Sequence, residues 1–176
     1  KYKIMKTNNL DITNLTFENE SQILSALKKQ ISLFNVFFDR LSILTKSVDY
    51  NNCDIIVFDS YPFDIEINEL SKYIDVWSSF FIKKNSSETN TNLLEFYNKN
   101  YLGFISDLTP KQYSLEIQHV LNEILTLSNN INYLFEFLPN CILTEIIRRF
   151  YPFDMTFNNV NKDIKIWVKN IKKIDS

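Results

Sequence analysis

Glycine is almost missing from this chain: Gly103 is the only glycine in 176 residues. Glycine adopts positive φ freely and lets the backbone approach a phosphate closely. Gly-rich phosphate loops, dinucleotide-binding fingerprints and G-x-S-x-G nucleophile elbows each need such residues at fixed spacing. The scarcity therefore argues against most enzymes that cradle a nucleotide. It favours an interaction module or the non-catalytic remnant of an enzyme.

Cysteine and long apolar runs are also scarce. Cys53 and Cys141 have no C-x-x-C partner and only His119 as a possible helper, whereas a zinc site needs about four ligands. We expect two buried reduced thiols, a histidine at the surface or rim, and no metal or cofactor. No apolar run approaches the ~20 residues of a membrane helix and no signal peptide opens the chain. We therefore expect a soluble intracellular protein with no membrane contact and no small-molecule substrate.

What the chain does contain fits a packed core: 45% of its residues are hydrophobic and 15% are aromatic, typical of a globular protein. The net charge is -2 and is unevenly spread. Residues 144–176 carry seven basic and four acidic side chains, giving +3 and leaving -5 for residues 1–143. This asymmetry suggests that the C-terminal part has a different partner from the rest.

The first half alternates strand-like and helix-like patterns. Residues 54–59 form an unbroken β-branched and aromatic run, and residues 76–82 are rich in aromatic residues, so both are predicted strands. Residues 31–44 fit either a helix or a buried strand. Apolar residues at helical spacing predict helices in three further segments, which are residues 18–29, 64–73 and 92–99. This order predicts a parallel α/β layer with right-handed crossovers.

After Pro110 the pattern is helical throughout, which places a domain boundary within residues 102–110. We predict an α/β domain over residues 1–108 and an all-α domain over residues 109–176. The expected helices of the second domain cover residues 113–127, 131–138, 141–150 and 161–174, with a turn at residues 151–154.

The last predicted helix is two-faced, because its lysines fall three or four residues apart and project together. These are Lys162, Lys165, Lys169 and Lys172, and Arg148 and Arg149 on the preceding helix could extend the same surface. Lysines often do no more than solvate the outer face of a surface helix. The alternative is contact with nucleic-acid phosphates, which gives salt-dependent binding without reading sequence.

Three acids bracket the first predicted strand: Asp54, Asp59 and Asp64. Carboxylates at the end of a parallel strand can hold the metal of a nuclease. No Glu-Arg-Lys run or acid pair with a nearby lysine accompanies them. Asp59 before Ser60-Tyr61-Pro62 is better explained as a turn residue. A metal-dependent nuclease is therefore the third alternative.

The order of these elements resembles the XPF-type structure-specific endonuclease family. The run Ile55-Ile56-Val57-Phe58-Asp59, the helix from Asn68, the strand from Trp77 and the helix from Leu93 are similar to the family's central domain. Residues 137–153 look like its tandem helix-hairpin-helix domain. The resemblance covers residues 45–176 and implies an inactive XPF nuclease-like α/β domain followed by a helix-hairpin-helix domain.

The family has catalytic subunits with a Glu-Arg-Lys metal motif and non-catalytic partners without it. This chain lacks the motif, so it looks like the partner type, most like the small sporulation-specific meiotic subunits. The resemblance implies an obligate heterodimer with an XPF-like protein, binding of branched DNA, and meiotic crossover formation and synapsis on nuclear chromosomes. The expected partner interface is Phe137, Leu138, Phe150, Phe153 and Trp167.

The hairpin segments 139–141 and 158–161 contain no glycine that would bring backbone N–H groups to a phosphate. DNA contact through the lysine stripe, or through the partner alone, is therefore the expectation.

A rival interpretation is a BTB-like adaptor. The run Cys53-Asp54-Ile55-Ile56-Val57, followed by Phe63, Leu70, Trp77 and Phe80-Phe81, loosely fits the first strand pair and helix of that family. The BTB resemblance implies a homodimeric protein-interaction module without DNA binding.

Overall fold

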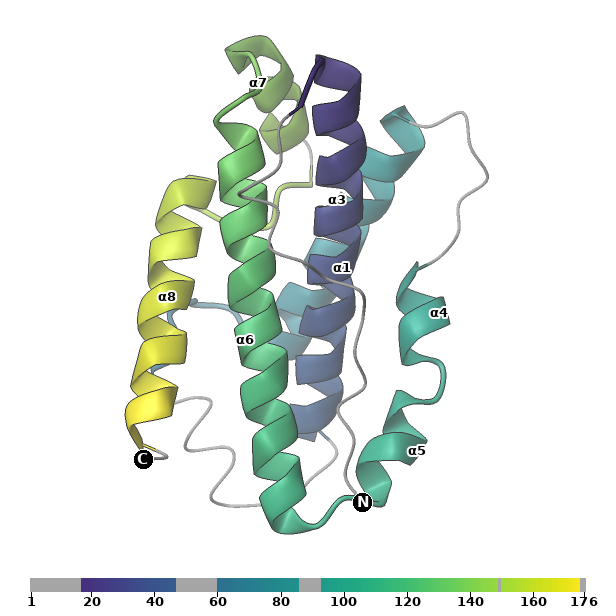
Figure 1. Cartoon of the computed structure of the whole chain (residues 1–176), viewed down its shortest axis with the longest axis vertical. Helices are drawn as coiled ribbons and strands as arrows, with labels where there is room; N and C mark the ends of the chain where they lie inside the picture. The colour runs from purple at the N-terminus through teal and green to yellow at the C-terminus, as the bar shows by residue number, and fades with distance from the viewer. Residues whose placement is uncertain (1–16, 47–59, 86–92, 149, 175–176) are drawn as a thin grey trace.

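The computed structural model describes residues 17–46, 60–85, 93–148 and 150–174, and in these ranges the regular elements are all helices. They are α1 (Glu20–Lys46), α3 (Ile67–Asn85), α4 (Leu93–Asn98), α5 (Tyr101–Ser106), α6 (Pro110–Phe135), α7 (Asn140–Arg148) and α8 (Phe157–Ile174). Helices α1 and α6 lie antiparallel and in contact, α3 packs on α1, and α8 packs on α6. The short helices α4 and α5 flank α1, while α7 lies at one end of the bundle (Figure 1).

The predicted parallel-sheet XPF nuclease-like domain is wrong, because the described part of the chain has no strand. Residues 76–82, predicted as a strand, lie inside α3. The buried positions Leu70, Ile74, Trp77 and Phe81 recur every three or four residues, which is a helical period. Their aromatic content had suggested a strand, but the spacing determines the structure. The other predicted strand, residues 54–59, lies outside the described residues.

Helix α1 includes the segment 31–44, which the sequence left open between helix and strand. At its start, Asn19 Oδ1 accepts a hydrogen bond of 2.9 Å from the Gln22 N–H, as an N-cap residue does. Eight consecutive residues from 31 to 38 are buried, because α1 contacts α3, α4 and α6 together. A helix that is covered on most sides lacks the one-sided apolar stripe that identifies a surface helix.

Helix α6 is continuous where the sequence predicted two helices, 113–127 and 131–138. Thr109 and Gln112 form a capping box at its start, and Pro110 occupies the first turn, where no N–H partner is needed. The predicted domain boundary at 108/109 coincides with this helix start. Buried side chains from both sides of it nevertheless belong to one hydrophobic core.

Two segments of the chain repeat each other at a spacing of 90 residues. Residues 61–77 and 151–167 align without a gap, and eight of these 17 positions are identical. The identical pairs are Tyr61 and Tyr151, Pro62 and Pro152, Phe63 and Phe153, Asp64 and Asp154, Asn68 and Asn158, Lys72 and Lys162, Ile74 and Ile164, and Trp77 and Trp167. Such a repeat identifies two copies of one structural unit.

At the same 90-residue spacing, the sequence of α1 aligns with that of α6, and the sequence of α3 aligns with that of α8. In the first pair, sequence identity is low but the buried positions correspond. Leu27, Ile31, Phe34, Leu41 and Leu44 of α1 match Ile117, Leu121, Ile124, Ile131 and Leu134 of α6. Among the described helices, α1 with α3 and α6 with α8 therefore form two helical hairpins of the same design.

The two repeats clasp each other through reciprocal aromatic contacts. Tyr61 of the first repeat packs on Trp167 of the second, with ring centroids 5.3 Å apart. Tyr151 of the second packs on Trp77 of the first at 5.4 Å. Equivalent residues contact each other in both directions, as in a twofold-symmetric dimer. The repeats therefore stabilise each other and share one core.

Each clasp tyrosine also closes its own turn. Tyr61 donates a hydrogen bond of 2.5 Å to the Ile65 carbonyl, and Tyr151 donates one of 2.8 Å to the Met155 carbonyl. Burial raises the pKa of both tyrosines well above the ordinary value, and nearby Asp154 adds to the rise at Tyr151. Both phenols therefore remain donors throughout the neutral range.

A buried arginine attaches the connecting helices α4 and α5 to the first repeat. The Arg40 guanidinium lies 5.0 Å from the Phe37 ring centroid and 4.9 Å from that of Tyr101. Its Nε donates to Asn98 Oδ1 at 2.7 Å, and its Nη2 donates to the Tyr97 carbonyl at 3.1 Å. Stacking and charge-assisted bonds together compensate for burying this cation.

Gly103 lies exposed in α5, where φ is not positive and an added Cβ would meet no atom within 4 Å. No geometric requirement for glycine acts at this position, and scarcity of glycine suits a chain that is mostly helical.

Candidate functional site: an apolar groove beside α7

The described residues enclose a pocket of about 380 Å³ between α7 and the pair α1 and α3. Its lining residues are Glu20, Leu24, Phe80, Phe81, Ile142, Glu145 and Ile146. Helix α7 is anchored beside α3 by a hydrogen bond of 3.0 Å from Trp77 Nε1 to the Ile146 carbonyl. The clasp residue Trp77 thus also positions one wall of the groove.

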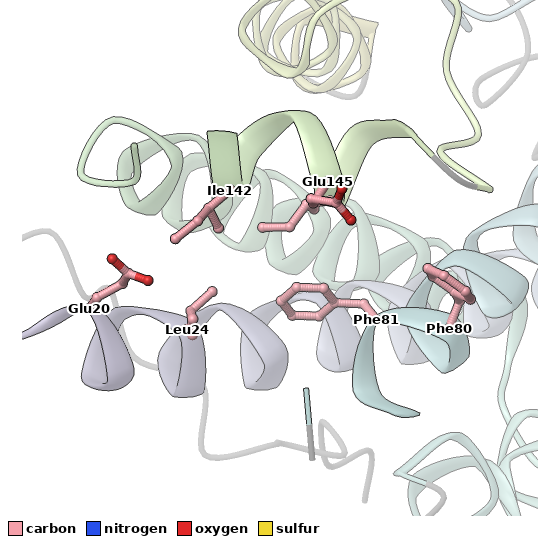
Figure 2. Close-up of a pocket in the computed structure, with 7 residues that line it drawn as sticks. Glu20, Leu24, Phe80, Phe81, Ile142 and Glu145 are labelled. Atoms are coloured by element: carbon pink, nitrogen blue, oxygen red, sulfur yellow. The ribbon is translucent and has the colours of Figure 1, made fainter. Parts of the chain in front are cut away.

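Figure 2 shows the two walls facing each other. Leu24 on α1 points toward Ile142 on α7, and the Phe81 ring on α3 extends along the groove toward Leu24. Glu20 lies at one end of the groove, and Glu145 lies on the α7 side. The groove therefore combines an apolar interior with carboxylates on both walls.

An exposed aromatic residue extends this surface at the Phe80 end. Phe150 is 56% exposed, and its ring centroid lies 5.1 Å from that of Phe80. Phe150 has φ of 61°, the one positive value among the described non-glycine residues. A left-handed backbone costs a residue with a Cβ about 1–2 kcal/mol. Phe150 lies two residues after the end of α7, and a left-handed residue at this place commonly ends a helix.

The internal repeat shows which groove residues the fold itself does not require. Leu24 corresponds to Ser114, Phe80 to Asn170 and Phe150 to Ser60. All three apolar residues thus have polar equivalents in the other copy, whereas the clasp residues are the same in both copies. The apolar surface is a feature that one repeat has and the other lacks.

The predicted partner-interface residues fall into two groups. Leu138, Phe153 and Trp167 are buried within the core of the chain itself. Phe137 and Phe150 are exposed, at 49% and 56%. Phe137 packs on Tyr133 rather than lining the groove. Of the predicted set, Phe150 is the residue that adjoins the groove.

The predicted DNA-binding residues lie mainly along α8. Lys162, Lys165 and Lys169 are exposed on that helix. Lys172 and Arg148 belong to α8 and α7, although their side chains are not described, and Arg149 lies outside the described residues. In the other repeat, Lys165 corresponds to Asp75 and Lys169 to Ser79. Lys165 and Lys169 therefore distinguish the second repeat from the first, whereas Lys162 has an equivalent in Lys72.

The predicted nuclease acids are not brought together. Asp64 is exposed in the turn before α3, whereas Asp54 and Asp59 lie outside the described residues. The described residues contain no cluster of three or more His, Cys, Asp or Glu side chains that could hold a metal ion.

Two further predicted features can be placed. Cys141 is exposed on α7 rather than buried as predicted, because it lies near the start of this short helix at the end of the bundle; Cys53 lies outside the described residues. His119 is half-buried, with its ring edge-on to Phe37 at 6.3 Å.

Within the described ranges, every helix is too short or too polar to cross a membrane.

Comparison of the chain with protein-family models, curated proteins and solved structures finds no match. The resemblance to XPF-type endonucleases therefore remains a prediction, and the sheet on which it partly depended is not present in the described residues. The fold defines a class: an all-α bundle of two clasped helical-hairpin repeats with an apolar groove at one end. The sequence reasoning missed Leu24, Phe80 and Ile142, which the 90-residue repeat could have singled out in part.

Proposed function

We propose that this chain is a non-catalytic helical subunit that binds a segment of a partner protein in the groove between α7 and the α1 and α3 pair. The proposal keeps one part of the sequence-based hypothesis, an interaction subunit with a protein partner. It does not depend on a nuclease-like sheet.

The difference between the two repeats is the observation that carries this function. Leu24, Phe80 and Phe150 occupy positions where the other copy has the polar residues Ser114, Asn170 and Ser60. The repeat therefore tolerates a polar residue at each of these positions. Exposed contiguous apolar surface on a soluble protein commonly marks an interaction site, and apolar grooves between helices receive apolar peptide side chains.

A photo-crosslinking experiment tests the groove directly. A benzophenone amino acid at position 142 of the full chain is expected to crosslink one discrete protein in a lysate of the native cell. The same amino acid at position 115 is expected to give no such product. Leu115 is exposed on α6, close to Tyr113, which donates a hydrogen bond to the Leu44 carbonyl near the far end of α1.

Phe80→Asp should reduce the crosslink at position 142 at least about tenfold, because it places a charge in an apolar contact. Val76→Asp is the matched control, since Val76 lies one turn earlier on α3, is 45% exposed and does not line the groove. Labelling of the same protein at positions 142 and 115, or labelling that persists in Phe80→Asp, would contradict the proposal.

Contact with nucleic-acid phosphates is a second candidate function, favoured by the lysines of α8. Lys165 and Lys169 stand where the first repeat has Asp75 and Ser79, so the stripe is not required for the repeat to fold. Together with Lys162 they form an exposed basic face.

Replacing Lys162, Lys165 and Lys169 with Glu is expected to weaken binding to duplex or branched DNA. The slope of log affinity against log salt should become shallower by about 0.9 for each phosphate that the variant no longer neutralises. Fluorescence anisotropy over a salt series measures both quantities. The control is a triple Lys→Glu variant at Lys29, Lys72 and Lys111, which are exposed on other helices. An unchanged affinity at low salt would remove α8 from DNA binding.

A further inference from the structure

The outer faces of α3 and α8 have the same exposed aliphatic position but opposite charges beside it. Val76 on α3 is 45% exposed, and its counterpart Ile166 on α8 is 58% exposed. Directly before them, Asp75 in the first copy corresponds to Lys165 in the second. The two copies of one structural unit therefore present faces of matched spacing and unlike sign.

The described residues of the α8 face are mainly basic. Lys162, Lys165 and Lys169 are exposed, and all three lie within one helical turn of Ile166 along the chain. Half-buried Asp163 is the one described acid of this helix. A surface that approaches α8 therefore meets an aliphatic side chain among three cations and one carboxylate.

The described residues of the α3 face have the opposite balance. Glu69 is exposed, and Asp75 is half-buried and accepts a hydrogen bond of 2.9 Å from Asn35 Nδ2. Because Asn35 is neutral, this bond leaves the carboxylate with its charge. Tyr73 lies between the two acids and is 50% exposed, and Lys72 is the described cation among them. The face thus combines exposed apolar side chains with two carboxylates and one cation.

The α3 face of a second copy of the chain complements more of the α8 face than phosphates do. Phosphates pair with the lysines, but they offer no apolar contact to Ile166 and repel Asp163. The α3 face offers carboxylates to the lysines, a cation to Asp163, and the apolar side chains Tyr73 and Val76 to Ile166.

We propose that the chain associates with itself through the α8 face of one copy and the α3 face of another. When the two helices pack antiparallel about Ile166 and Val76, equivalent flanking positions lie on the same side of the contact, so Lys165 lies opposite Asp75. The two faces differ, so the contact is heterologous and either closes into a ring or continues from copy to copy. A contact through one helix face per copy is weak, because it buries less than the ~1,200 Å² of stable interfaces.

Sedimentation velocity on the full chain at low salt measures this association. Over a range from about 10 μM to about 1 mM, where weak complexes form, the weight-average mass should rise above that of one copy. Added salt should lower it again, because salt screens charges at an exposed contact.

Two charge-reversal variants supply the decisive comparison. Lys165→Glu/Lys169→Glu and Glu69→Lys/Asp75→Lys should each associate at least about tenfold more weakly than the unchanged chain, because like charges then face each other. An equal mixture of the two variants should associate again, because each face then meets one of opposite sign. The fold accepts either charge at the central position, since Asp75 and Lys165 are equivalent in the two repeats.

The control variant is Lys29→Glu/Lys111→Glu, which makes the same change in net charge as Lys165→Glu/Lys169→Glu at exposed positions on α1 and α6. It should associate like the unchanged chain. Far-UV circular dichroism confirms that all three variants remain helical.

Each other outcome overturns the inference. Unchanged association of either reversal variant alone places the contact elsewhere. A mixture that stays as single copies, although both variants are helical, overturns the pairing of α8 with α3. An unchanged chain that remains a single copy over the whole range overturns self-association, and DNA binding lost in Lys165→Glu/Lys169→Glu then assigns the lysines to phosphate contact. The crosslink at position 142 is measured below these concentrations, so the groove and the self-contact fail separately.

Discussion

Replacing Trp167 with alanine is expected to lower the free energy of unfolding by about 3–5 kcal/mol, as large-to-small substitutions of buried aromatic residues do. Trp167 is fully buried and packs on Tyr61 of the other repeat. The loss should therefore destabilise both repeats together. Urea denaturation followed by far-UV circular dichroism measures the change.

The chain has two tryptophans, so tryptophan fluorescence can test whether the two repeats unfold together. In Trp167→Ala the remaining tryptophan is Trp77, so its fluorescence reports on the contact of α3 with Tyr151 and α7, while circular dichroism reports on the whole bundle. The two transitions should coincide. Tyr73→Ala, at a residue 50% exposed on α3, is the control and should change stability by no more than about 0.5 kcal/mol. A fluorescence transition that does not coincide with the circular dichroism transition would contradict a shared core.

Trp77→Ala should show a similar loss of stability and a local consequence that Trp167→Ala lacks. Trp77 Nε1 donates to the Ile146 carbonyl in α7, so its removal frees one wall of the groove. Trp77→Ala should therefore weaken binding in the groove as well as the stability of the bundle.

Helical periodicity in the sequence predicted much of the second half of the fold. Expected helices at 92–99, 141–150 and 161–174 correspond to α4, α7 and α8, because each has apolar residues on one face. The same reasoning failed at residues 76–82, where a dense aromatic run was weighted above the spacing that continues from Leu70 and Ile74. Propensity for strands is weak evidence when a helical period runs through the segment.

The repeat went unrecognised because its identities are concentrated in one short segment. The 17 positions from Tyr61 to Trp77 carry eight identities with the second copy, whereas α1 and α6 share mainly a pattern of burial. The aromatic residues that join the repeats must each fit one particular neighbour, so few other residue types are tolerated there. Positions in the long helices need only be apolar and of suitable size.

The groove could be predicted only in part. Phe150 was expected at a partner interface, but Leu24, Phe80 and Ile142 come from three helices that are far apart in the sequence. Each is a single apolar residue in an amphipathic pattern, and none is conspicuous alone. Their meeting depends on how α7 is held against α3, which local sequence does not encode.

Arg40→Met is expected to be strongly destabilising, by about 3–5 kcal/mol, because it leaves a buried acid without its cation. Burial lowers the pKa of Arg40, while Tyr101 and Glu116 act in the opposite direction. Glu116 is fully buried on α6 and accepts a hydrogen bond from the Tyr101 hydroxyl. Arg40, Tyr101 and Glu116 thus join α1, the connecting helix α5 and α6 in one polar network.

The symmetry-equivalent pair of positions shows that an uncharged arrangement is compatible with the fold. Arg40 corresponds to Asn130, which donates a hydrogen bond of 2.9 Å to Gln30, and Glu116 corresponds to Ala26. The double variant Arg40→Met/Glu116→Gln should therefore be more stable than Arg40→Met alone, because no unpaired charge remains buried. Arg40→Lys should not restore wild-type stability, since an ammonium cannot reproduce the planar stack between Phe37 and Tyr101.

A double-mutant cycle in urea measures the coupling between Arg40 and Glu116. Coupling above about 0.5 kcal/mol is expected for residues in one network, whereas independent sites give additive effects within roughly that margin. Additive losses would show that Glu116 is stabilised without Arg40 and that α5 is attached to the two repeats separately. Coupled losses would show instead that Arg40 and Glu116 stabilise the contacts among α1, α5 and α6 as one network.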